Sequence, residues 1–112
     1  MSLSAMQSWF KTMSNNKKAI TILKVMYEMT IVVRSMSVSE DRSKLLAASM
    51  LNSEMNHRIS NYAASLLSGQ PSVPEDVIIS MIDASLADDR FAGYAEHVWE
   101  KIVKEVDGMA DS

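Results

Sequence analysis

The chain has 112 residues, of which 14 are acidic and 11 basic, giving a net charge of −3, and it contains no cysteine. This length fits one domain that is large enough to hold a hydrophobic core. The lack of cysteine excludes disulfides, thiolate zinc sites and cysteine nucleophiles, and the acidic balance argues against nucleic acid or an anionic membrane as a partner.

A short first helix is predicted over residues 3–13, because apolar residues recur there at intervals of three and four. Trp9 lies beside this apolar face, and aromatic side chains often anchor protein interfaces. Trp9 and Phe10 are therefore candidate interface residues, although docking on the chain's own core is the favoured alternative. The apolar face consists of Leu3, Met6, Phe10 and Met13.

The second predicted helix, residues 17–36, contains the most apolar stretch of the chain. Lys24, Glu28 and Arg34 lie within it. A membrane span needs about 20 mostly apolar residues, and each central charge costs about 2.5–3.5 kcal/mol. We therefore expect a buried helix and no membrane partner. A helix that is apolar on nearly every side must also be covered on nearly every side, which is one reason to expect a second subunit.

The third predicted helix, residues 38–68, is the long central element of the expected fold. Ser37 and Glu40 have capping-box spacing at its start, and Gly69 and Pro71 follow its end. One face is a heptad seam, in which the spacing alternates between three and four and one member is polar. The seam consists of Leu45, Ala48, Asn52, Met55, Ile59, Tyr62 and Leu66.

The length of this helix makes its seam a candidate interface. About 30 helical residues extend over roughly 45 Å, whereas a compact domain of this size is only about 30 Å across. The helix is therefore expected either to break, near Asn52 or Ser60, or to protrude with its seam covered by another chain. The second case predicts self-association through the seam.

Two shorter helices are predicted after the linker, at residues 74–87 and 90–107, with a frayed tail at 109–112. Ser72 and Glu75 have capping-box spacing before the first of them, and Asp88-Asp89 is expected to cap the second. Together the five segments predict an all-α fold, a single-domain helical bundle of four to five helices with one long central helix.

Glu54 and His57 have the Glu-x-x-His spacing that places a carboxylate and an imidazole on one helix face. Helical di-iron proteins use this spacing twice, together with two further glutamates. Here it occurs once, so a solvated polar face is the favoured interpretation, and no metal or cofactor is predicted. A metal-binding helical protein that uses Glu54 and His57 ranks third among the functions considered.

Catalysis has little support in the sequence. His57 and His97 are candidate general bases, because histidine as a residue type ordinarily titrates near neutrality. However, the chain has no glycine-rich phosphate loop and no serine in a strand-to-helix elbow. We therefore predict that the protein is not an enzyme.

A small nucleic-acid-associated regulator is the second hypothesis. The last two helices are expected to form a helix-turn-helix pair, and lysines make the N-terminal third basic. Glu96, Glu100 and Glu105 would repel phosphate on the would-be recognition helix, which weakens the idea.

The leading hypothesis is a non-enzymatic protein–protein interaction module, homo-oligomeric through the third helix and located in the cytoplasm. An adaptor, a chaperone-like protein or an inhibitor or immunity-type protein would fit it. The expected partner is a second copy of the chain or another protein.

Overall fold

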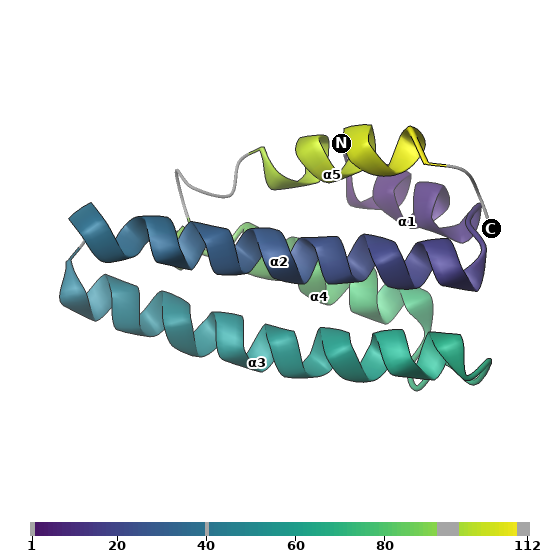
Figure 1. Cartoon of the computed structure of the whole chain (residues 1–112), viewed down its shortest axis with the longest axis horizontal. Helices are drawn as coiled ribbons and strands as arrows, with labels where there is room; N and C mark the ends of the chain where they lie inside the picture. Colours follow the sequence, from purple (N-terminus) through teal and green to yellow (C-terminus); the bar gives the residue numbers. More distant parts are fainter. Residues whose placement is uncertain (1, 40, 92–96, 110–112) are drawn as a thin grey trace.

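The computed structural model describes residues 2–39, 41–91 and 97–109. In these residues the chain is an all-α helical bundle without strands, as the sequence predicts (Figure 1). The α-helices are α1 (Leu3–Lys11), α2 (Asn15–Ser39), α3 (Arg42–Leu67), α4 (Glu75–Leu86) and α5 (Val98–Asp107), and a 3-10 helix, η1 (Asp89–Phe91), follows α4.

The two long helices, α2 and α3, form an antiparallel hairpin that runs the length of the molecule (Figure 1). α3 is unbroken, so neither of the expected breaks, near Asn52 or Ser60, occurs. The bundle is instead elongated, with extents of 41 × 25 × 22 Å, and α2 accompanies α3 along its length. None of the helices in the described part of the chain is both long enough and apolar enough to span a membrane.

The join between α2 and α3 lies later in the sequence than predicted. α2 continues to Ser39, although the capping box at Ser37 predicted that one helix ends and the next begins near Ser37. The carboxylate of Asp41 caps α3 instead, accepting a hydrogen bond of 2.6 Å from the backbone nitrogen of Ser43. A capping aspartate satisfies one of the unpaired amides of the first turn, and this sets the start of α3 at Arg42.

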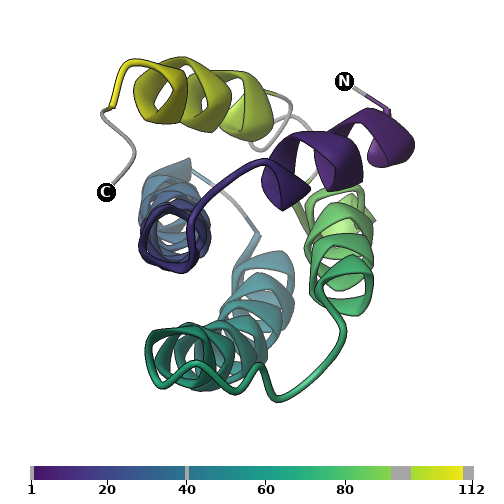
Figure 2. The ribbon, with the colours of Figure 1, turned by 90° about the vertical axis from the view of Figure 1, so that its right-hand side faces the viewer.

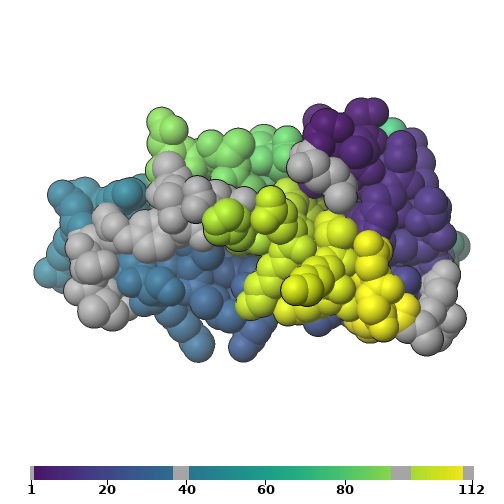
Figure 3. Space-filling model, turned by 90° about the horizontal axis from the view of Figure 1, so that it is seen from above, coloured from purple at the N-terminus to yellow at the C-terminus, as the bar shows by residue number. Residues whose placement is uncertain are grey.

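The shorter helices cover the inner side of this hairpin. α4 lies behind α3, α1 packs on α4, and α5 lies along α2 on the side away from α3 (Figures 1 and 2). Figure 3 shows α5 lying over α2, with α1 on the same face of the molecule. Every helix contributes to one core, whose largest fully buried side chains include Phe10, Ile22, Met29, Ile59, Tyr62, Ile79, Ile82, Phe91 and Ile102.

The predicted fifth helix, residues 90–107, is shorter in the structure. η1 ends at Phe91 and α5 begins at Val98. The reason lies at Asp88, whose carboxylate accepts hydrogen bonds of 2.8–2.9 Å from the backbone and the guanidinium of Arg90. This local turn fixes a 3-10 helix, and the buried ring of Phe91 then packs into the core. Residues 92–96 and the tail from 110 lie outside the described residues.

Candidate interaction surface

The predicted seam of α3 lies inside the bundle. Six of its seven residues are buried by the chain's own helices, and Leu45 is half-buried: the buried six are Ala48, Asn52, Met55, Ile59, Tyr62 and Leu66. The sequence predicted that a second chain covers this seam. In the structure α2 and α4 of the same chain cover it, so the seam is not available as an interface. Within the seam, Asn52 donates a hydrogen bond of 3.4 Å to the hydroxyl of Thr30 on α2.

The two aromatic interface candidates of the first helix also dock on their own chain. Phe10 is fully buried in the core. Trp9 is half-buried, and its indole nitrogen donates a hydrogen bond of 2.8 Å to the carboxylate of Asp107 on α5. The structure thus places both residues between α1 and the rest of the bundle, in line with the alternative that the sequence favoured.

The basic N-terminal third is largely neutralised by acidic residues from the second half of the same chain. Lys18 forms an ion pair of 2.7 Å with Glu75, and Lys24 one of 3.2 Å with Glu105. The ammonium group of Lys17 reaches the backbone oxygen of Met109 at 3.3 Å. The charge asymmetry along the sequence is therefore used to hold the chain together.

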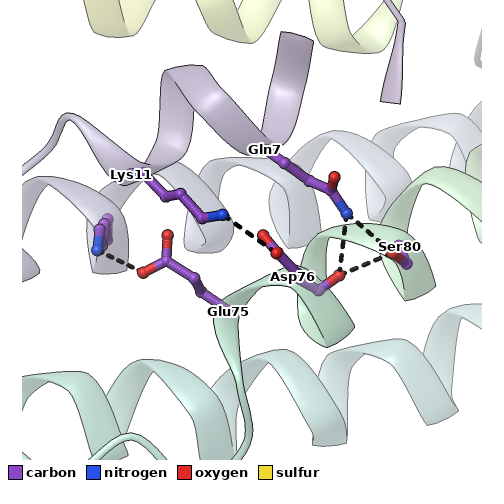
Figure 4. Close-up of polar contacts among 6 residues, drawn as sticks. Gln7, Lys11, Glu75, Asp76 and Ser80 are labelled. Atoms are coloured by element: carbon purple, nitrogen blue, oxygen red, sulfur yellow. Dashed lines mark hydrogen bonds and ion pairs between the residues drawn. The ribbon is translucent and has the colours of Figure 1, made fainter. Parts of the chain in front are cut away.

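Figure 4 shows the polar contacts between α1 and the first turns of α4. Lys11 forms an ion pair of 3.1 Å with Asp76. The amide of Gln7 donates to the backbone oxygen of Asp76 and to the hydroxyl of Ser80. Together with the Lys18–Glu75 ion pair, these contacts tie the N-terminal segment to α4 and pair two of the four lysines in the N-terminal third with carboxylates.

Glu54 and His57 are both exposed on α3, and each contacts the residue one turn further on. Glu54 pairs with Arg58 at 2.8 Å, and an imidazole nitrogen of His57 lies 3.3 Å from the amide of Asn61. Within the described part of the chain, no three His, Cys, Asp or Glu side chains are grouped as metal ligands.

A different surface stands out on the outer side of the hairpin, the side that no other described helix covers (Figure 2). It combines exposed residues of α2 and α3 that recur at intervals of three, four and seven. We define this outer face by Asn16, Ile20, Leu23, Tyr27 and Arg34 of α2 and by Leu46, Met50, Ser53, His57, Ser60, Ala64 and Leu67 of α3.

The outer face is unusually apolar and poor in charge. It holds six large apolar side chains that are 36–65% exposed: Ile20, Leu23, Tyr27, Leu46, Met50 and Leu67. Arg34 is the only Asp, Glu, Lys or Arg residue among the twelve, and the exposed Arg42 continues the α3 stripe one turn before Leu46. Helix α5 shows the usual pattern for a surface in water, since its exposed positions include Glu100, Lys101, Lys104, Glu105 and Asp107.

Sequence reasoning missed this surface because it concentrated on the inner seam. A second heptad pattern, displaced by one or two residues from the first, was present in the sequence at Leu46, Met50, Ala64 and Leu67. Both stripes contain apolar residues, so periodicity alone could not decide which one faces the core. The packing of α2 and α4 decides it.

A shallow groove of about 220 Å³ between α3 and α4 is another apolar feature of the described surface. Val73, Val77 and Met81 line it, with Arg58 at its edge. The guanidinium of Arg58 is already engaged by Glu54. The groove is smaller and more local than the outer face.

The chain matches no protein-family model, and comparisons with curated proteins and with solved structures also gave no match.

Proposed function

We propose that the protein is a non-enzymatic interaction module, and that it binds another polypeptide through the outer face of its α2–α3 hairpin. The observation that carries this proposal is the twelve-residue outer face with six large exposed apolar side chains and one charge. Monomeric proteins rarely expose large contiguous apolar patches. The buried centres of protein interfaces are likewise depleted of charge and enriched in aromatic residues and Met.

The chemistry of the face favours a protein over a nucleic acid. Phosphate binding needs several cations on one surface, and the outer face offers Arg34 alone. Lys11, Lys18 and Lys24, which a nucleic-acid interface would use, are paired with carboxylates of the same chain. A cytoplasmic location, with an adaptor, chaperone-like or inhibitor role, belongs to the same proposal.

Site-specific photo-cross-linking in the source organism tests the proposal. A benzophenone amino acid replaces Met50, which is 65% exposed on the outer face, and in a control chain it replaces Ala84, which is exposed on α4. We expect a discrete cross-linked product with position 50 and none with position 84. If position 50 gives no product, or if both positions give the same products, the outer face is not a binding surface.

A further inference from the structure

The outer stripe of α3 has a symmetric composition. Its seven residues are all exposed, and their spacing alternates between four and three from Leu46 to Leu67. Read from either end, the stripe begins with leucine, continues with Met or Ala and then serine, and reaches histidine at the centre. In order, the residues are Leu46, Met50, Ser53, His57, Ser60, Ala64 and Leu67.

Such a stripe is complementary to itself when two copies run antiparallel. If two α3 helices meet at His57, Leu46 lies over Leu67 of the partner subunit, and Ser53 lies over Ser60 of the partner subunit. Heptad spacing keeps such a stripe facing its neighbour over several turns. A two-fold interface requires this kind of self-complementarity, because the same surface serves both subunits.

Helix α2 lies beside α3 in this surface, but its stripe lacks the symmetric composition: seven residues from Tyr27, Ile20 stands on one side and Arg34 on the other. Two contacts set the register of the hairpin, from Asn52 to Thr30 and from Ser60 to Met26. These contacts place Tyr27 of α2 level with His57 of α3. In an antiparallel pair of hairpins the two-fold axis would therefore pass near Tyr27, and its ring, which is 64% exposed in the single chain, would lie at the centre of the contact.

The area of the outer face suits a stable dimer. The α3 stripe from Leu46 to Leu67 covers 22 residues and is about 33 Å long, and two helices side by side are about 20 Å wide. The face therefore offers about 650 Å² per subunit, within the roughly 600–1,000 Å² that each partner contributes to a standard interface. Because the face is nearly free of charge, pairing it with itself brings few like charges together.

We propose that the partner of the outer face is a second copy of this chain, and that the two α2–α3 hairpins pack face to face and antiparallel about a two-fold axis at His57 and Tyr27. This inference rests on the proposed function and adds the identity and the geometry of the partner. The dimer leaves the inner seam in the core of each subunit.

Sedimentation of the unmodified protein is the first test. At tens of micromolar we expect twice the 12.5 kDa mass of one chain. Replacing both Leu46 and Leu67 with Glu buries unpaired charges at each end of the interface, and we expect the association constant to fall about 100-fold or more. A strict monomer, or an oligomer other than a dimer, overturns the inference.

Cysteine cross-linking then tests the geometry. Because the sequence has no cysteine, every disulfide that forms must involve an introduced residue. The His57→Cys variant is expected to form a dimer in which a disulfide joins position 57 of one subunit to position 57 of the other. Leu46→Cys is expected to cross-link with Leu67→Cys when the two variants are mixed. Leu46→Cys alone is expected to remain unlinked, because the two copies of residue 46 lie about 33 Å apart in the antiparallel arrangement. Ala84→Cys on α4 is the matched control.

The cross-links separate this inference from the proposed function. A dimer in which Leu46→Cys links to itself, or in which the mixed pair does not link, overturns the antiparallel arrangement. Thermal unfolding of each variant, compared with the natural protein, shows whether the variant is folded. The sedimentation result for the unmodified protein does not depend on any variant. If the protein is monomeric but Met50 cross-links to a different polypeptide in cells, the second copy is refuted and the interaction module stands.

Discussion

Lys18 of α2 and Glu75 of α4 form the most buried of the ion pairs between the described residues, with 2.7 Å between the ammonium nitrogen and a carboxylate oxygen. Their side chains are 11% and 24% exposed, and the Lys18 ammonium also lies 5.5 Å from the centre of the Phe10 ring. Lys18 of α2 thus contacts both the start of α4, through Glu75, and α1, through the ring of Phe10.

The neighbouring pair Lys11–Asp76 is a useful comparison, because it also joins a lysine to a carboxylate at the start of α4. Its distance is 3.1 Å, and both of its side chains are about half-exposed. We expect a coupling energy of about 1–2 kcal/mol for Lys18–Glu75 and less than about 0.5 kcal/mol for Lys11–Asp76. Double-mutant cycles with alanine, followed by urea unfolding, measure both values. Equal coupling energies would show that burial does not strengthen the Lys18 contact.

The hydroxyl of Tyr62 is buried and has no hydrogen-bond partner among the described residues. We expect Tyr62→Phe to raise the free energy of unfolding by about 1 kcal/mol, because it removes an unsatisfied polar group without changing the shape of the ring. Urea unfolding at neutral pH measures the change. Tyr27→Phe, at a ring that is exposed in the single chain, is the control and is expected to be neutral at a protein concentration low enough to keep the chain monomeric.

The same tyrosine predicts a loss of stability in alkali. Desolvation by burial, and then the charge of Glu75, raise the pKa of Tyr62 from 10.0 to about 12 in the folded protein. The unfolded chain loses the Tyr62 proton near pH 10, whereas the folded protein keeps it until about pH 12. The contribution of protonated Tyr62 to the free energy of unfolding is therefore intact below pH 10 and is lost as the pH rises to about 12. Tyr62→Phe is expected to flatten this part of the stability profile. An unchanged profile would mean that other groups cause the alkaline loss.

The two stripes of α3 are expected to respond oppositely to truncation. Ile59 is fully buried in the inner seam, and Ile59→Ala is expected to cost about 2–5 kcal/mol by leaving a cavity. Leu67, which is 61% exposed on the outer face, is expected to change the stability of the monomer by less than about 0.5 kcal/mol when replaced by Ala. Chemical unfolding at low protein concentration separates these effects from association. A large cost at Leu67 would place it in the core.

Gly69 ends α3 in a left-handed conformation, with φ at +81°, and no other atom would crowd a Cβ there. Gly69→Ala is therefore expected to cost about 1 kcal/mol, from backbone strain alone. Gly108 follows α5 with φ at −79°, and a Cβ would meet only ordinary contacts. Gly108→Ala is expected to be neutral or to stabilise by about 0.5 kcal/mol. Thermal unfolding of both variants decides, and equal effects would contradict the role of φ.

The sequence by itself determined the helical class and the approximate place of most helices. Apolar residues at intervals of three and four identify α1, α2, α3 and α4, since a helix repeats every 3.6 residues wherever it lies. The local stop at Gly69 could also be predicted, because few residues other than glycine adopt a positive φ. Competition between caps was harder to predict: Asp41 overrode the capping box at Ser37, and the turn at Asp88 shortened the predicted last helix.

Only the tertiary structure decided which apolar stripe of α3 is core and which is surface. Ile59 and Leu67 belong to two heptad stripes that both contain large apolar residues, and the first is fully buried while the second is 61% exposed. The same holds for the lysines of the N-terminal third, such as Lys24, whose carboxylate partner is 81 residues away in the sequence. Helical periodicity is a local property of the chain, whereas burial and charge pairing depend on contacts between segments that only folding brings together.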